Sequence, residues 1–251
     1  MANEVQVKFN AFDLDTGDYT IGRIDIKESK RPKLHRIPRI DGSIAEEGKR
    51  SSLKIAVTGD VIGTNYDDLR SNIDALKAAL QNSIQKFTTD DDRYIKAQLE
   101  SFNYKYRTMR TFATYKTVFL AHFPFWLAES ETTDDRTPTS GSGYTINNPG
   151  NANARLKIEV TAPGGGISDD IQIENETMGT LLRYRGDVAA ADVLEIDNRY
   201  DTDDFEVLND GSDDHANYEG DFLELQPGNN TITFTGAAGT GVKLYYRATY
   251  M

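Results

Sequence analysis

Apolar and polar residues alternate with a period of two along most of this chain, which predicts a protein built mainly from short β-strands. Val5, Val7 and Phe9 show the pattern near the N-terminus, with polar residues between them. We expect further strands wherever the alternation or a run of β-branched and aromatic residues recurs. In the first half of the chain these stretches are 21–26, 53–59, 94–100, 102–107 and 110–122.

The period changes to that of an α-helix in one place. Apolar residues there are spaced four, three, four and four positions apart, so they share one helical face. Thr64 or Asn65 can cap the first turn, and Asp67 and Asp68 suit its positive end. We therefore predict one helix over residues 65–84. Its apolar face comprises Leu69, Ile73, Leu76, Leu80 and Ile84.

Two segments lack regular apolar periodicity. Residues 27–50 hold two prolines, two glycines and many cations, so we predict an extended arm or long loop. Residues 131–143 are polar and rich in Thr, Ser and Gly, so we predict a linker there. The predicted domains are therefore an N-terminal β domain, 1–130, and a C-terminal one, 144–251.

In the C-terminal half, short alternating stretches recur with turn residues between them, which predicts a β-sandwich. In the stretch "LQPGNNTITFTG", Pro227 and Gly228 suit a type II turn. Ile232 and Phe234 should then share one face of a strand. Val242, Leu244, Tyr246 and Ala248 should share a face of the last strand. The remaining predicted strands are 156–160, 171–173, 181–185, 193–197, 205–208 and 221–225.

Charge divides the chain at the same place as the linker. Residues 1–130 carry 20 Lys and Arg against 18 Asp and Glu, whereas residues 131–251 carry 8 against 22. The acidic half should repel nucleic acid, so we expect no sequence-specific nucleic-acid binding. No apolar run has the roughly 18 residues of a membrane helix, and no secretory signal is visible, so we expect synthesis in the cytoplasm without membrane insertion.

No motif for catalysis or cofactor binding is present, and we predict neither an enzyme nor a cofactor site. The chain has no cysteine, and His35, His122 and His215 lie far apart in sequence. Metalloprotease, nucleophile-elbow, phosphate-loop and dinucleotide motifs are all missing. A Ser-His-Asp set assembled in space stays open, although no motif supports it.

Three binding hypotheses remain open from the residues. The acidic segment 201–214 offers oxygen ligands for calcium but lacks EF-hand spacing, so we favour solvated loops. The many tyrosines allow an aromatic sugar platform, for which Tyr184 and Tyr218 are candidates, but they fit strand positions, so we favour a core or cross-strand role. The five cations of the arm suit either nucleic acid or an acidic neighbouring subunit. These residues are Lys30, Arg31, Lys33, Arg36 and Arg39.

Four stretches together resemble the distal tail proteins of phages with long, non-contractile tails. The first is "RIPRIDGSIAEEGKRSSLKIAVTGDVIG", and the helix "DDLRSNIDALKAAL" follows it. The third is "TVFLAHFPFWLAES". The fourth is the C-terminal series "NNPGNANARLKIEV", "IQIENETMGTLLRY", "LEIDNR", "LQPGNNTITF" and "VKLYYRATYM". Their order spans nearly the whole chain.

The resemblance implies a structural component of the virion at the phage tail tip. It implies a homo-hexameric ring made by the N-terminal domain, with the arm 27–50 reaching the neighbouring subunit. It also implies a galectin-like fold for the C-terminal sandwich. The implied partners are the tail tube protein and a tail hub or adhesion protein of the baseplate. The alternative function is a carbohydrate-binding module for host cell-wall glycans, since fold alone does not give function.

Overall fold

The computed structural model describes residues 7–28, 33–36, 43–46, 50–81, 83–89, 92–107, 111–168, 170–200 and 205–251. The chain forms two compact units, Met1–Trp126 and Leu127–Met251. Each unit has its own cluster of buried apolar side chains, and no residue belongs to both clusters. The prediction of a mainly β protein with one α-helix is confirmed.

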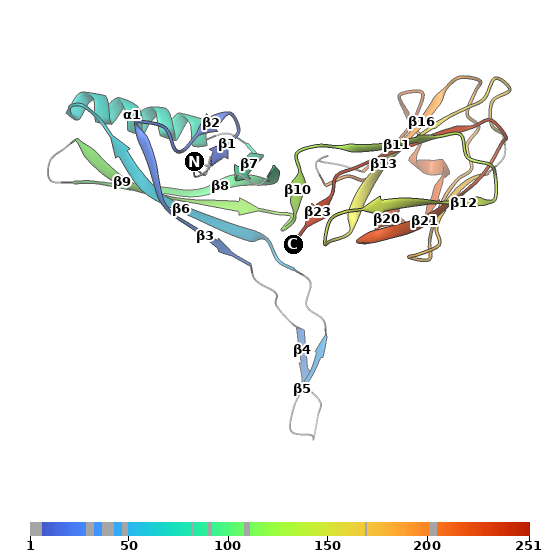
Figure 1. The fold of residues 1–251 in the computed structure, drawn as a ribbon, viewed down its shortest axis with the longest axis horizontal. Coiled ribbons are helices and arrows are strands. Elements are labelled where there is room, and N and C mark those ends of the chain that lie inside the picture. Colours follow the sequence, from blue (N-terminus) through green and yellow to red (C-terminus); the bar gives the residue numbers. More distant parts are fainter. Residues whose placement is uncertain are drawn as a thin grey trace. The chain divides into compact units, whose positions relative to one another are not determined.

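The N-terminal unit is built on one antiparallel sheet with the strand order β2-β1-β7-β8-β9-β6-β3. Figure 1 shows helix α1 (Tyr66–Leu80) lying along one side of this sheet. The seven strands are β1 (Lys8–Phe9), β2 (Phe12–Asp13), β3 (Tyr19–Lys27), β6 (Leu53–Ile62), β7 (Gln85–Thr89), β8 (Arg93–Tyr106) and β9 (Phe112–Ala121). The short strand β10 (Trp126–Ala128) follows at the division between the units.

Helix α1 forms where the periodicity predicts it. The side chain of Asn65 accepts a hydrogen bond from the backbone N–H of Asp68, at 3.0 Å, and so caps the first turn. Asp68 in turn accepts bonds from the backbone and hydroxyl of Thr64, both at 2.8 Å. The helix ends at Leu80, so Ile84 lies beyond it and is exposed, contrary to the prediction. The other four predicted apolar residues are buried: Leu69, Ile73, Leu76 and Leu80.

Aromatic side chains fill the core between helix and sheet. The ring of Phe119 stacks on Phe9 with centroids 4.7 Å apart and contacts Phe87 at 5.2 Å. Trp126 packs against Phe87 at 6.4 Å, so the aromatic strand that precedes the division contributes to this core. Alternate residues of β6 and β9 are buried, as expected for a sheet that is covered on one face.

The predicted arm contains a small hairpin. Strand β4 (Lys33–Arg36) pairs with β5 (Ser43–Glu46), and among the described residues this pair joins no other sheet. The remaining residues of segment 29–49 lie outside the part that the structure describes.

The C-terminal unit is a sandwich of two antiparallel sheets. One has the order β11-β22-β13-β16-β17-β18, with β20 also paired to β13, and the other has the order β12-β21-β14-β15-β19. The strands are β11 (Thr132–Arg136), β12 (Ser142–Asn148), β13 (Ala154–Thr161), β14 (Ile171–Asn175), β15 (Thr180–Tyr184), β16 (Val193–Asp197), β17 (Glu206–Asn209), β18 (Ser212–Asp213), β19 (Tyr218–Gly220), β20 (Glu224–Leu225), β21 (Gly228–Thr235), β22 (Gly241–Tyr246) and β23 (Thr249–Tyr250), with a 3-10 turn, η1 (His215–Asn217).

The turn before β21 adopts the backbone that its sequence requires. Gly228 has φ +86°, the region that the third residue of a type II turn needs. The buried Asn230 closes the turn, because its side chain donates to the carbonyls of Gln226 (2.9 Å) and Gly228 (3.0 Å). Ile232 and Phe234 then point into the core, as predicted. The predicted inner face of the last strand is also buried.

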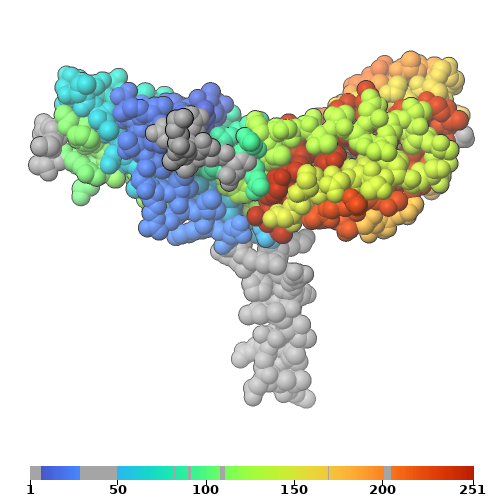
Figure 2. Space-filling view, in the orientation of Figure 1, coloured from blue at the N-terminus to red at the C-terminus, as the bar shows by residue number. Residues whose placement is uncertain are grey.

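The prediction of a linker over residues 131–143 is wrong, because parts of this segment form strands of the sandwich. Residues Thr132–Arg136 form β11, which pairs with β22, and β12 begins at Ser142. The segment was missed because "TTDDR" has no apolar residue, and four of its five side chains are exposed on an edge strand. In the space-filling view, the yellow-green chain of β11 and β12 covers part of the visible surface of this unit (Figure 2).

Candidate interaction surfaces

His122 and His215, the two histidines whose side chains the structure describes, each bond to neighbours within their own unit. His122 bonds to Gln98 at 2.9 Å in the N-terminal unit, and His215 lies in the C-terminal unit between the carboxylate of Asp213 and the carbonyl of Phe205. The side chain of His35 lies outside the described part. Among the described residues, no group of three or more His, Asp or Glu could hold a metal ion. No helix that the structure describes is long and apolar enough to cross a membrane.

The Asp213 side chain controls the protonation of His215. Its hydrogen bond raises the pKa of His215, and the carbonyl of Phe205 acts in the same direction. The bond to His215 in turn lowers the pKa of Asp213. Both ring nitrogens face acceptors, so the doubly protonated imidazolium fits this position better than the neutral ring.

The described carboxylates of the acidic segment 201–214 do not converge on one point. Asp201 and Asp203 lie outside the described residues. Asp213 pairs with His215, whereas Asp214 accepts bonds from the hydroxyl of Tyr184 and the amide of Asn217. These carboxylates therefore stabilise the loops around η1, and the calcium hypothesis gains no support from them.

The predicted interface residues of the arm cannot be placed as a group. Lys30, Arg31 and Arg39 lie outside the described residues. Lys33 and Arg36 are the first and last residues of β4, and only their backbone is described. The assignment of these five cations to a subunit interface stays a prediction.

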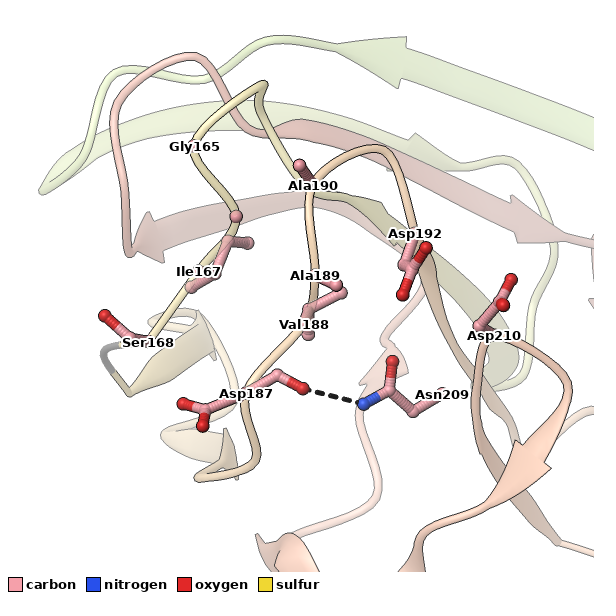
Figure 3. Close-up of a pocket in the computed structure, with 11 residues that line it drawn as sticks. Gly165, Ile167, Ser168, Asp187, Val188, Ala189, Ala190, Asp192, Asn209 and Asp210 are labelled. Carbon is pink, nitrogen blue, oxygen red and sulfur yellow. Dashed lines mark hydrogen bonds between the residues drawn. The ribbon is translucent and has the colours of Figure 1, made fainter.

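A cleft lies among the loops at one end of the sandwich (Figure 3). It has a volume of about 390 Å³ and is lined by small residues and by the carboxylates of Asp187, Asp192 and Asp210. Asn209 donates to the carbonyl of Asp187 at 2.8 Å and to the hydroxyl of Tyr184 at 3.0 Å, which ties two of the loops together. The lining contains no aromatic side chain, so this cleft offers no stacking surface to a sugar.

Aromatic rings gather elsewhere on the same unit. Phe205 contacts Tyr218 at 5.2 Å and Phe222 at 4.6 Å, and the rings of Tyr218 and Phe222 stack with centroids 6.0 Å apart. Phe222 is 49% exposed. Tyr184, one of the two tyrosines considered for sugar stacking, is fully buried and cannot serve that role. The exposed ring of this cluster is therefore Phe222, and the ring of Tyr218 stacks against it.

The N-terminal unit exposes a second aromatic surface, which we call the tyrosine strip: Phe102, Tyr104 and Tyr106 of β8 with Tyr66 of α1. Adjacent rings in this strip lie 5.5–6.0 Å apart. Burial raises the pKa of Tyr106, and its neighbours Tyr104 and Tyr66 add to the effect.

A groove of about 240 Å³ adjoins the tyrosine strip. Its walls come from the last turns of α1 and from β8, and the ammonium of Lys77 lies 4.7 Å above the ring of Tyr104. Sequence reasoning missed the strip. The alternation of Phe102, Tyr104 and Tyr106 indicates that they share one face of a strand. It does not indicate that α1 leaves this part of the face uncovered.

Comparison with known proteins shows which proteins this architecture resembles. Residues 149–250 match the family described as "Siphovirus-type tail component, C-terminal domain". The C-terminal unit is therefore similar to the C-terminal domain of siphovirus-type tail components. No curated protein sequence matches the chain.

The fold of the whole chain agrees with this class. The chain resembles SPP1 Dit, described as a paradigm of hub adsorption apparatus in Gram-positive infecting phages, with a TM-score of 0.78 and 15% identity over 99% of this chain and 100% of that one. It also resembles a chain of the phage p2 baseplate in its activated conformation, with Sr (TM-score 0.52, 8% identity, 96% and 98% coverage) and with Ca (0.51, 9%, 96% and 98%). The resemblance to distal tail proteins is thus confirmed in the family match of residues 149–250 and in the fold of the whole chain.

Proposed function

We propose that this chain forms a closed, six-fold ring at the tip of a phage tail and joins the tail tube to the adhesion apparatus. The observation that carries the proposal is the whole-chain likeness to SPP1 Dit, together with the family match of residues 149–250. The two separate cores support it, because one unit can build the ring while the other faces other tail proteins. The partners we propose are the tail tube protein and a baseplate adhesion protein.

The hairpin of the arm supports assembly with a neighbour. A two-stranded hairpin by itself is marginally stable in water, and among the described residues β4 and β5 pair only with each other. We propose that the arm gains its support from a neighbouring subunit in the ring. The cations assigned to this contact are Lys30, Arg31, Lys33, Arg36 and Arg39.

Native mass spectrometry of the full chain tests the ring. The mass of one chain is 28.0 kDa, so a six-fold ring has a single dominant mass at six times that value. We expect this species alone or after addition of the tail tube protein. A chain that stays monomeric in both conditions would contradict the proposal.

A second candidate function, saccharide binding, is favoured by the exposed ring of Phe222. A sugar can stack its C–H face on such a ring, and the net negative charge of this half of the chain excludes anionic polymers more readily than neutral sugars. Glycan-array binding by the full chain would test it. We expect Phe222→Ala to remove binding, whereas Phe123→Ala, which changes a ring of similar exposure in the other unit, should preserve it.

A further inference from the structure

The exposed ring of Phe222 stands on a backbone that close contact with β15 holds in place. The N–H of Asp221 donates to the carbonyl of Leu181 at 2.8 Å. Gly220 has φ +99°, and a Cβ at this position would lie 2.2 Å from the carbonyl oxygen of Leu181. Only glycine permits so close an approach with this backbone conformation. The side chains of Asp221 and Phe222 are therefore presented from a rigid support.

The polar groups beside this ring are hydrogen-bond acceptors. The hydroxyl of Tyr218 donates to the carbonyl of Asp221 at 2.7 Å, which leaves the lone pairs of its own oxygen to accept. The carboxylate of Asp221 accepts from the N–H of Leu181 at 3.3 Å through Oδ2, and its Oδ1 receives no hydrogen bond from a described residue. Both ring nitrogens of His215 already face acceptors. A ligand at this surface must therefore bring donors of its own.

The charge beside the ring is negative. Burial raises the pKa of Tyr218 to about 12, and the carboxylate of Asp221 adds to the effect, which places this carboxylate near the hydroxyl. Glu206 acts in the same direction on the pKa of His215, although less strongly than the bond to Asp213. Among the described residues, neither Asp221 nor Glu206 forms an ion pair. Two carboxylates near the aromatic rings thus lack a cation to balance them within this chain.

We infer that the surface formed by Phe222, Tyr218 and Asp221 binds saccharides that carry free ammonium groups, such as polymers of glucosamine, in preference to neutral or N-acetylated saccharides. The inference rests on the saccharide-binding function proposed above and names the chemical class of its ligand. An ammonium group brings three donors and a positive charge, which match the acceptors and the negative charge of the surface. A cation is also attracted to the face of an aromatic ring, and the C–H face of the sugar can stack on Phe222.

An amino sugar suits this surface better than a lysine side chain of a protein partner. The rings of Tyr218 and Phe222 lie nearly parallel, with 20° between their planes, so together they form one platform. A pyranose ring is rigid and holds its amine at a fixed distance from the face that stacks. A lysine side chain has a flexible four-carbon stem and loses rotamer entropy when it is ordered on a surface. The saccharide therefore gives up less freedom for the same contact with Asp221.

Isothermal titration calorimetry of the full chain with two oligosaccharides of equal length tests the preference. The probes are the chitosan and chitin hexasaccharides, which differ only in the acetyl group on each amine. The measurement is made below the pKa of the sugar amine, so that the chitosan hexasaccharide is cationic. We expect it to bind at least about tenfold more tightly than the chitin hexasaccharide. Added salt should reduce this difference, because it screens exposed charges.

The variant that tests the site is Asp221→Asn, which keeps the shape of the side chain and removes its charge. We expect its affinity for the chitosan hexasaccharide to fall about tenfold, whereas its affinity for the chitin hexasaccharide should stay that of wild type. The control is Asp210→Asn, which changes the net charge by the same amount. Asp210 follows the end of β17 that is farther from Phe205. The control should change neither affinity by more than about twofold.

The possible outcomes separate this inference from the function on which it rests. Equal affinity of wild type for the two hexasaccharides, or an equal loss in Asp221→Asn and Asp210→Asn, would show that the ammonium preference is wrong while saccharide binding stands. If neither hexasaccharide binds, the saccharide-binding function fails, and the inference fails with it. A hexalysine peptide should bind at least about tenfold more weakly than the chitosan hexasaccharide. Equal binding of the peptide would mean that the surface receives a basic protein segment, and it would overturn the inference.

Discussion

The ring centroids of Tyr66 and Tyr106 lie 5.9 Å apart, which joins the first turn of α1 to the last residue of β8. This contact fixes one end of the tyrosine strip, although both rings remain partly exposed. An aromatic surface that is held rigidly and left open to water is typical of a binding contact. The following predictions test what this surface and the rest of the fold do.

Removing the tyrosine strip should abolish assembly and leave the fold intact. We expect the double variant Tyr104→Ser, Tyr106→Ser to shift the full chain from ring to monomer in analytical ultracentrifugation. Both side chains are more than a third exposed, so the free energy of unfolding should change by no more than about 1 kcal/mol. Phe123→Ser, at an exposed position away from the strip, is the control and should still form rings. Rings in the double variant would show that the strip is not a subunit contact.

The two cores should unfold as separate units. Phe119→Ala removes a buried ring between Phe9 and Phe87, and Phe234→Ala removes a buried ring from the sandwich. Each change should cost about 3–5 kcal/mol of stability in its own unit. In calorimetry we expect two unfolding transitions. Phe119→Ala should lower the midpoint temperature of one transition, and Phe234→Ala should lower that of the other. A single transition that both variants shift equally would argue against two independent cores.

The amide of Asn230 should be a main support of the turn before β21. It accepts from the N–H of Gln226 (3.0 Å) and from Asn175 (3.1 Å), in addition to the two carbonyls that it donates to. Asn230→Ala leaves buried groups without partners, at about 1–3 kcal/mol for each. Urea unfolding should show that the free energy of unfolding of the C-terminal unit falls by an amount of this order. Asn229→Ala, at an exposed neighbour, should lie within about 0.5 kcal/mol of wild type.

The pair His215 and Asp213 should make a small contribution to stability that depends on pH. The pKa of His215 is raised in the folded chain, so its contribution is complete below 6.5, the ordinary value, and is lost as the pH rises through the folded pKa. An NMR titration of the His215 ring should give a pKa above 6.5, and Asp213→Asn should lower it. An unchanged pKa in that variant would mean that Asp213 is not its cause.

The sequence predicted the elements whose residues repeat in a simple pattern. The buried face of α1, its Asn65 cap and the turn at Gly228 all follow from local chemistry. Strand β11 did not, because an edge strand exposed on both faces needs no apolar residue. The exposure of the tyrosine strip could not be predicted either, since it depends on how far α1 covers β8, a relationship between elements that no local pattern contains.

The central claim is that copies of this chain form a closed ring at the tail tip through their N-terminal units. Electron cryomicroscopy of the assembled full chain tests it most directly. We expect a closed ring of six copies in which the N-terminal units of neighbouring copies contact one another. A ring whose subunits meet only through the C-terminal sandwiches would contradict the account.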